Sequence, residues 1–292
     1  MAGSELRYGS LFSGIGGIDL GLDLAGFECA WQVEIDDYCR QILDKHWPGV
    51  PKYKDIYEVK GSEIEPVDII CGGFPCQPVS QAGKRVGVDD ERWLWSEFYR
   101  LICEIKPRWV VAENVPGLLS ANFGRAFAEV LRDLAEGGYD VVWDVFPAGG
   151  PGGVGALHQR QRIFIIGKLA KSESKRHGRR TGKKRRIKRR KFQQSKQRRS
   201  KVGSKTKGRS KSHGDNMADN DRKRLKEQLW PQSVEEESIE RSSWWCTEPS
   251  VGRVANGVPN RVDRLRALGN AVVPQVAYKV ARMIYEYTEK EK

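Results

Sequence analysis

Residues 6–18 have the sequence LRYGSLFSGIGGI, in which an apolar segment runs into a glycine-rich turn. We predict a strand over Leu6–Phe12 and, after the turn, a helix from about Ile18 to Ala25. Glycine has no Cβ, so this turn lets the backbone approach a ligand closely, at the strand end where open α/β sheets bind ligands. On this motif alone, a ligand site and a plain glycine-rich turn remain equally open.

Short apolar strands and amphipathic helices continue to alternate up to about Leu169, and a helical pattern returns near the C-terminus. This alternation is typical of βαβ units, so we predict the α/β fold class with a parallel, doubly wound sheet. Further strands are predicted at 29–33, 68–71, 109–113, 139–146 and 162–167, and further helices at 38–45, 96–105, 123–135 and 274–287.

Charge is concentrated in one segment. The 292 residues carry a net charge of +13, but residues 171–211 alone contain 21 Lys and Arg and one acid, a net of +20. The other 251 residues hold 30 basic and 37 acidic residues, a net of −7. A segment of like charge repels itself, and its clustering favours contact with nucleic-acid phosphates over a solvated linker that binds nothing.

Three parts are predicted from these patterns: a main domain over 1–169, a basic insert over 170–249, and a segment over 250–292 that returns to the main domain. No apolar run approaches the roughly 18 residues of a membrane span, which argues against an integral membrane protein. The N-terminal residues lack the pattern of a secretory signal. Six cysteines are too few for a disulfide scaffold and none form a Cys-x-x-Cys pair, so we expect reduced thiols, a cytoplasmic protein and no metal site.

Glu34 directly follows the second predicted strand and stands 20 residues after Gly14. An acid in this place accepts hydrogen bonds from ribose hydroxyls in dinucleotide-binding folds, although a solvated surface acid is the simpler alternative. Together, the turn and Glu34 favour a cofactor that contains a nucleoside. Asp55 and Ile56, at the end of the next segment, are weaker candidates for facing its adenine.

Cys76 lies in the sequence GGFPCQP at 72–78, between two prolines and after a predicted strand. Prolines restrict the backbone and hold the thiol in one direction. A thiolate is a strong nucleophile once its pKa is lowered, so we favour a nucleophile here over a small buried apolar residue. The cysteines with a helix or strand pattern are expected to be buried, and these are Cys29, Cys39, Cys71 and Cys103.

Charged groups also stand at two other strand ends. Glu113 opens the sequence Glu-Asn-Val-Pro, where an apolar surround would raise the pKa of its carboxyl and let it donate a proton; a helix-capping or surface acid is the alternative. Arg160 and Arg162 alternate around the start of a strand, so they share one face and can hold a carboxylate or phosphate. Taken alone, that pair fits a solvated edge strand better.

In this order, these motifs resemble those of the DNA cytosine-5 methyltransferases. The resemblance covers about residues 6–169 and 250–287, and it implies a Rossmann-like methyltransferase sheet with a small basic target-recognition insert. The matching strings are Phe-Ser-Gly-Ile-Gly-Gly at 12–17, Gly-Gly-Phe-Pro-Cys-Gln at 72–77, Glu-Asn-Val at 113–115, Arg-x-Arg at 160–162 and Arg-Ala-Leu-Gly-Asn-Ala-Val-Val-Pro at 266–274.

The resemblance implies S-adenosylmethionine as the cofactor. The glycine-rich turn would hold it, Glu34 would bind its ribose, and Asn270 would reach it from the C-terminal segment. The implied cofactor-binding residues are Phe12, Gly14, Gly16, Gly17, Glu34, Ile35, Asp55, Ile56, Pro75, Leu94 and Asn270.

The resemblance also implies methylation of carbon 5 of cytosine in duplex DNA. Cys76 would add to C6 of a flipped-out base, Glu113 would hydrogen-bond N3 and the exocyclic amine, and Arg162 with Arg160 would orient Glu113 and the ring oxygen O2. The loop from Ser80 to Glu91 would close over the base.

Three features depart from the family pattern. The usual longer stretch before the last motif is reduced to Arg253–Arg264. His158 stands where the family has glutamine, and the interval that usually reads bases is the basic, apolar-poor insert, whose Trp230, Trp244 and Trp245 are expected to pack rather than stack on bases. A tRNA cytosine methyltransferase and a DNA-binding homologue with weak turnover therefore stay open as alternatives. The expected partners are duplex DNA and a cognate restriction endonuclease, with a monomeric chain and no membrane.

Overall fold

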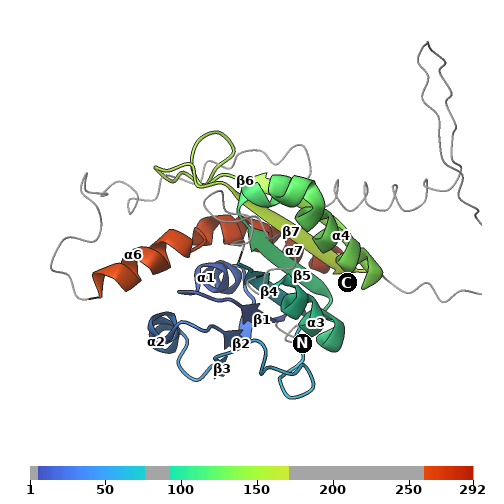
Figure 1. Ribbon diagram of the computed structural model, residues 1–292, viewed down its shortest axis with the longest axis horizontal. Coiled ribbons are helices and arrows are strands. Elements are labelled where there is room, and N and C mark those ends of the chain that lie inside the picture. The colour runs from blue at the N-terminus through green and yellow to red at the C-terminus, as the bar shows by residue number, and fades with distance from the viewer. Residues whose placement is uncertain (1–5, 76–92, 171–259, 292) are drawn as a thin grey trace, which may run out of the picture.

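The computed structural model describes residues 6–75, 93–170 and 260–291, in which a seven-stranded sheet is packed between helices (Figure 1). The strand order is β3-β2-β1-β4-β5-β7-β6. The strands are β1 (Arg7–Leu11), β2 (Glu28–Val33), β3 (Lys52–Tyr53), β4 (Ile69–Gly73), β5 (Trp109–Asn114), β6 (Tyr139–Phe146) and β7 (Arg162–Leu169). The helices are α1 (Gly17–Leu24), α2 (Asp37–His46), α3 (Trp95–Ile105), η3 (Pro116–Gly124), α4 (Arg125–Glu136), α6 (Arg261–Asn270) and α7 (Pro274–Lys290).

The predicted α/β class with a doubly wound sheet is confirmed, but the expectation that every strand runs parallel is wrong. Strands β3, β2, β1, β4 and β5 pair in parallel, whereas β7 pairs antiparallel with both β5 and β6. Parallel neighbours need a long crossover, usually a helix. The glycine-rich stretch 147–161 between β6 and β7 contains no helix, so β7 turns back and inserts between β5 and β6.

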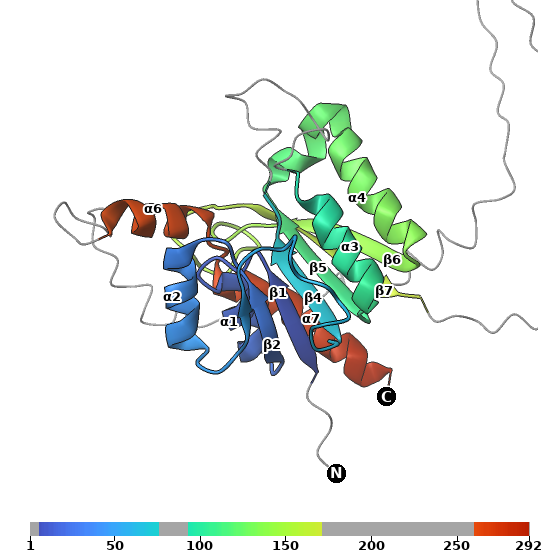
Figure 2. The ribbon, with the colours of Figure 1, turned by 60° about the horizontal axis from the view of Figure 1, so that its bottom comes forward.

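Each face of the sheet buries its own apolar cluster, because successive strand residues point to opposite sides. Tyr8 and Ile69 belong to the cluster that contains α1 and α7, whereas Leu11 and Ile70 belong to the cluster that contains α3 and α4. Figure 2 shows α1 and α7 on one side of the sheet and α3 and α4 on the other. The C-terminal helix α7 therefore completes the helical layer that covers the α1 face of the sheet.

Several local features differ from the sequence-based expectation. Strand β3, the 3₁₀ turns of η3 and helix α6 have no counterpart among the predicted elements. Cys29, Cys39 and Cys71 are buried as expected, but Cys103 is exposed, because it lies on the side of α3 that faces away from the sheet cluster. None of the helices in the described ranges has the length and apolar character that a membrane crossing requires.

Candidate functional site

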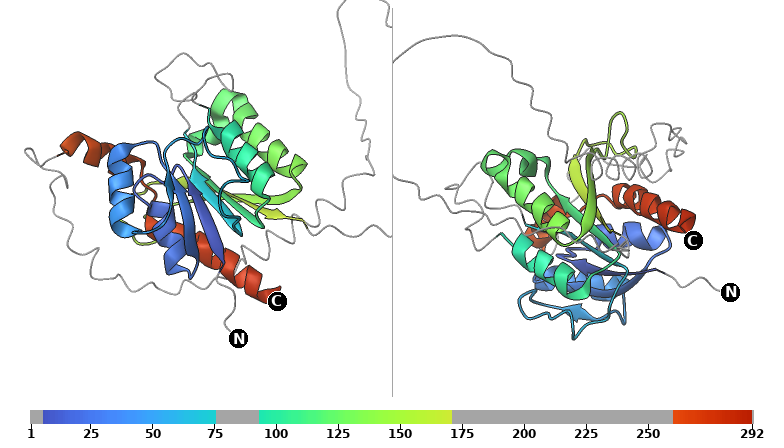
Figure 3. Two further views of the ribbon diagram at one scale, coloured as in Figure 1. Left: turned by 90° about the horizontal axis from the view of Figure 1, so that it is seen from below. Right: turned by 90° about the vertical axis from the view of Figure 1, so that its right-hand side faces the viewer.

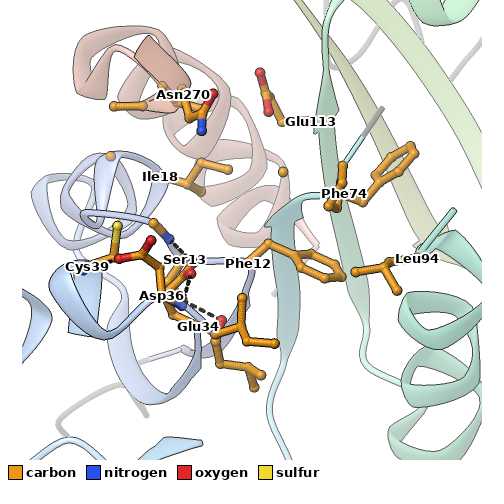
Figure 4. A pocket seen from close by; sticks show the side chains of 18 of the residues that line it. Phe12, Ser13, Ile18, Glu34, Asp36, Cys39, Phe74, Leu94, Glu113 and Asn270 are labelled. Atoms are coloured by element: carbon orange, nitrogen blue, oxygen red, sulfur yellow. Dashed lines mark hydrogen bonds between the residues drawn. The ribbon is translucent and has the colours of Figure 1, made fainter. Parts of the chain in front are cut away.

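A cavity of about 460 Å³ opens at the carboxyl ends of β1, β2, β4 and β5 (Figure 4). Phe12 and Leu94 point toward each other inside it. Ten of the eleven predicted cofactor-binding residues line the cavity; Gly16 does not, and caps α1 in the same turn instead. The ten are Phe12, Gly14, Gly17, Glu34, Ile35, Asp55, Ile56, Pro75, Leu94 and Asn270.

A chain of buried hydrogen bonds supports the turn after β1. Asp19 accepts hydrogen bonds from Ser10 Oγ at 3.1 Å and from Gln32 Nε2 at 2.8 Å, and Ser13 Oγ donates to Ser10 Oγ at 2.9 Å. Between the two serines, Phe12 has a φ of 52°, a left-handed conformation that costs a non-glycine residue free energy. We infer that this network stabilises the strained backbone that aims Phe12 into the cavity.

Glu34 ties two loops of the cavity together. Its Oε2 accepts a hydrogen bond from the Gly14 backbone N–H at 2.7 Å, and its Oε1 accepts one from the Asp36 N–H at 2.8 Å (Figure 4). A carboxylate has about four acceptor positions, so both oxygens keep capacity for hydroxyl groups of a ligand. The carboxylate is therefore pre-oriented for a vicinal diol such as that of ribose.

The walls beside Glu34 suit a flat aromatic ring. Ile35 and Tyr57 line the rim of the cavity and are 64% and 59% exposed. Ile56, the residue before Tyr57, also lines the cavity but is buried. Apolar side chains exposed at a concave site are typical of ligand pockets. The residues present thus fit an adenosine group: acceptors for the ribose and apolar surfaces for the base.

Several side chains at the cavity were missed by the sequence-based prediction, and Asp36 and Cys39 are two of them. Asp36 accepts a hydrogen bond from the Cys39 N–H at 3.1 Å and so caps α2; it also pairs with Arg266 of α6. Cys39 is buried at the cavity wall, where burial and then the Glu34 and Asp36 carboxylates raise the pKa of its thiol to about 12. The Asp-Asp-Tyr sequence before a helical pattern is an N-cap signal that would have indicated Asp36. Figure 3 shows α6 beyond the end of α2, where the pairing with Arg266 joins them.

Glu113 lies at the end of β5 and lines the cavity, with only 6% of its surface exposed. Arg162 Nε lies 2.9 Å from Glu113 Oε1, but no donor in the described chain makes a hydrogen bond to that oxygen. Burial raises the pKa of the Glu113 carboxyl to about 7, against the lowering effects of Arg162 and Arg160. Near neutral pH this group therefore exchanges its proton readily, which suits acid–base work.

The carboxyl of Glu113 lies close to the backbone at Gly73. A Cβ at Gly73 would lie 2.6 Å from Glu113 Oε2. Next to it, Asn114 Nδ2 donates a hydrogen bond to the Phe74 carbonyl at 2.9 Å and fixes the chain just before Pro75. Cys76 follows directly and lies outside the described residues, as do the loop 80–91, the insert and its three tryptophans.

The structure separates the two predicted arginines. Arg162 reaches Glu113, but Arg160 does not line the cavity, and its Nη2 donates hydrogen bonds to the carbonyls of Gly269 and Ala271 at 2.5 and 2.6 Å. These carbonyls flank Asn270, which does line the cavity.

We expect the close packing between α1 and the C-terminal segment to be intolerant of a single methyl group. A Cβ at Gly17 would lie 2.4 Å from the Val272 carbonyl oxygen, so Gly17→Ala should lower the free energy of unfolding by about 1–3 kcal/mol and weaken binding at the cavity. The control is Gly269→Ala in α6, where a Cβ meets open space and should be neutral or stabilising. Urea unfolding of both variants checks this, and equal stabilities would contradict it.

The sequence matches the family model for C-5 cytosine-specific DNA methylase over residues 6–252. The chain is 36% identical to Type II methyltransferase M.FnuDI of Fusobacterium nucleatum over 159 residues, which cover 54% of this chain and 45% of that protein. It is 35% identical to Type II methyltransferase M.AquIA of Picosynechococcus over 187 residues, covering 58% of this chain and 74% of that protein. The chain thus spans less than half of the first relative's length.

Among solved structures, that of the S. pombe Dnmt2 methyltransferase is similar with a TM-score of 0.46 and 21% identity, over 56% of this chain and 51% of that one. The family model covers well over half of the chain, including the turn at 12–17 and the strings at 72–77, 113–115 and 160–162. The chain therefore belongs to the C-5 cytosine-specific DNA methylase family.

Proposed function

We propose that this protein transfers a methyl group from S-adenosylmethionine to carbon 5 of cytosine in duplex DNA. The observation that carries the proposal is the buried Glu113 beside Arg162 on the wall of a cavity that also suits an adenosine group. Such a cavity brings a proton-exchanging carboxyl and a cofactor site together, as transfer to a heterocyclic base requires.

The cofactor would lie with its ribose on Glu34 and its adenine between the apolar side chains at the rim, with Asp55 and Ile56 beside it. Pro75 and Leu94 would border the methionine part, and Asn270 would close the cavity from the C-terminal segment. When bound, S-adenosylmethionine supplies an electrophilic methyl group. The remaining steps depend on side chains of this chain.

Cytosine C5 is a weak nucleophile, so the chain must activate the ring. In the proposed reaction the Cys76 thiolate forms a bond to C6, and the electron pair of the C5–C6 double bond moves to C5. C5 would take the methyl group as the bond between that methyl and the sulfonium sulfur breaks, which leaves a neutral thioether. A base then removes the C5 proton, the double bond re-forms, and the C6–sulfur bond breaks to release the thiolate. In a duplex the ring is stacked, so the base must be flipped out first.

Glu113 would hold a proton at N3 while Cys76 adds, and would accept from the exocyclic amine. Because Glu113 is buried, its interaction with the ring takes place away from bulk water. Electrostatic interactions are stronger in such a buried site than in water. Arg162 would orient Glu113 and donate to O2 of the ring. Both side chains line the cavity and lie next to each other.

The names of the relatives, Type II methyltransferases, support a restriction–modification setting. For this setting we propose a cognate endonuclease as a functional partner, and we propose that this chain acts as a monomer. The direct experiment offers duplex DNA and bulk tRNA in parallel with S-adenosylmethionine labelled in its methyl group, followed by bisulfite sequencing of the DNA. Label at cytosine C5 in one repeated DNA context is expected. Label only in tRNA would replace the DNA proposal with the RNA alternative, and no label in either, with cofactor bound, would indicate a homologue that binds without turnover.

Deleting residues 171–211 should weaken DNA binding and flatten its salt dependence. The segment carries 21 Lys and Arg, and each ion pair with a phosphate adds about 0.9 to the slope of log affinity against log salt. Removing several such ion pairs should cost about 10²-fold or more in affinity at low salt. Fluorescence anisotropy across a salt series measures both effects.

The matched control keeps residues 171–211 at the same length and composition but in scrambled order, and should bind DNA nearly as well as the original chain. An unchanged slope after the deletion would mean that the segment does not contact phosphates. A scrambled segment that binds as poorly as the deletion would mean that its sequence, rather than its charge, is recognised.

A further inference from the structure

Arg160 lies in the connection between β6 and β7, two residues before β7 begins. Its side-chain hydrogen bonds are made to the C-terminal segment and not to Glu113. Its Nη2 donates to two carbonyls, that of Gly269 at 2.5 Å and that of Ala271 at 2.6 Å. The residue between those carbonyls is Asn270, which lines the cofactor cavity. One guanidinium thus holds the backbone on both sides of Asn270, at a junction where Ala271 also lines the cavity.

The carbonyls that Arg160 binds need a donor from elsewhere in the chain. They stand at the end of α6, where the last carbonyls of a helix have no partner within the helix. The next helix begins with Pro274, which has no N–H to offer back to this junction. A cation at a helix C-terminus is also favoured by the helix dipole. The junction between α6 and α7 that presents Asn270 is therefore stabilised largely by Arg160, which belongs to neither helix.

The backbone of Arg160 supports the same conclusion. Its φ is 23°, a conformation that is unfavourable for any residue with a Cβ and persists only where other contacts enforce it. The Gly149 region of the same loop packs closely, since a Cβ there would lie 2.2 Å from the Ala156 carbonyl oxygen. A strained residue in a closely packed loop is a precise anchor for the segment that it holds.

We propose that Arg160 is a positioning residue for the methyl donor: it fixes Asn270 at the cofactor cavity, whereas Arg162 forms the ion pair with Glu113. Arg160 acts on that carboxyl only through its charge. This inference rests on the proposed function, since it assumes that the cavity binds S-adenosylmethionine. It changes the role expected for the Arg-x-Arg motif from two arginines at the target base to one at the base and one at the cofactor segment.

The experiment compares Arg160→Ala, Arg160→Lys and the control Arg162→Ala in the full chain. Isothermal titration with S-adenosylmethionine, without DNA, gives the cofactor Kd of each variant. Arg160→Ala should raise this Kd at least about tenfold, because it removes two hydrogen bonds from a charged donor. Arg160→Lys should recover part of the loss, since lysine can still reach one carbonyl. Arg162→Ala should leave the cofactor Kd within about twofold and lower kcat instead.

A double-mutant cycle with Asn270→Ala separates positioning from general loss of structure. If Arg160 acts through Asn270, Arg160→Ala should raise the Kd much less in the Asn270→Ala background than in the wild type. Full additivity, or a cofactor Kd for Arg160→Ala within twofold of wild type, would overturn the inference. Failure of the wild-type chain to bind S-adenosylmethionine would instead overturn the proposed function.

Thermal unfolding of each variant detects whether a substitution has caused a folding defect. Arg160→Ala should unfold within a few degrees of Arg162→Ala, because its contacts are made at one helix end and not in the sheet. If Arg160→Ala does not fold, Arg160→Lys carries the test: a Kd raised severalfold with coupling to Asn270→Ala supports the inference, and an unchanged Kd overturns it.

Discussion

Replacing Cys76 with serine is expected to lower methyl transfer by about 10⁴-fold or more, the scale of loss when a covalent nucleophile is removed. A serine hydroxyl stays protonated at neutral pH and adds poorly to C6, whereas a thiol with a lowered pKa supplies a thiolate. The cofactor Kd should stay within about twofold, because most residues that fit S-adenosylmethionine lie on other segments and the neighbouring Pro75 is unchanged. Single-turnover transfer of labelled methyl to DNA and calorimetric cofactor binding measure the two quantities separately.

Cys103→Ser provides the matched control for this prediction. Cys103 is a free, exposed cysteine on α3, so its replacement should leave both transfer and cofactor binding unchanged. Turnover by the Cys76→Ser variant close to that of the wild type would rule out the covalent mechanism. A loss of cofactor binding in the same variant would show that position 76 shapes the cavity itself.

The fold was predictable where the sequence pattern is local. The apolar strand, glycine turn and helix at 6–25 follow from the pattern of single residues, and β1 and α1 occupy the expected places. The direction of β7 was not predicted, because a strand looks the same in sequence whichever way it runs. Only the length and glycine content of 147–161, which contains no crossover helix, carried that information.

Part of the site, likewise, could be predicted from the sequence, and part could not. Glu34 was predicted from its 20-residue spacing to Gly14, and the two residues are hydrogen-bonded at 2.7 Å. Glu113 and Arg162 were candidates from their places at strand ends, but it was the family resemblance that implied that they act together; Arg162 Nε lies 2.9 Å from Glu113 Oε1. The pairing of Arg160 with carbonyls more than a hundred residues away was not predictable, because it depends on how the C-terminal segment docks onto α1.

These observations suggest why the site tolerates unfavourable features. Phe12 and Arg160 both have left-handed backbones, and Glu113 is a buried carboxyl without a hydrogen-bond donor to Oε1 in the described chain. Each costs stability, and each stands at or beside the cavity. Such concentration is expected where a site is held ready for a ligand that supplies the missing partners.

Replacing Glu113 with glutamine should reduce methyl transfer by about 10²–10³-fold and alter its pH dependence. The pKa of the carboxyl is about 7, so the protonated form that donates to N3 is lost as the pH rises through 7. The wild-type rate should therefore carry a falling limb on the alkaline side that the variant lacks, since an amide keeps its N–H at every pH. Single-turnover rates between pH 5.5 and about 9 test this.

The same replacement should stabilise the protein, with a sign fixed by the direction of the pKa shift. Because folding raises the pKa of the Glu113 carboxyl from 4.5 to about 7, ionisation opposes folding: the penalty is absent below pH 4.5 and complete above pH 7. Its size is up to about 3 kcal/mol. Glu113→Gln should thus unfold at higher urea than the wild type at pH 8 but not at pH 4.5, whereas Glu63→Gln, at an exposed ion pair with Lys60, should show no such difference. A Glu113→Gln variant that is less stable than the wild type at pH 8 would mean that the Arg162 contact outweighs burial. Glu113 would then work as a fixed carboxylate and not as the proton donor proposed for cytosine.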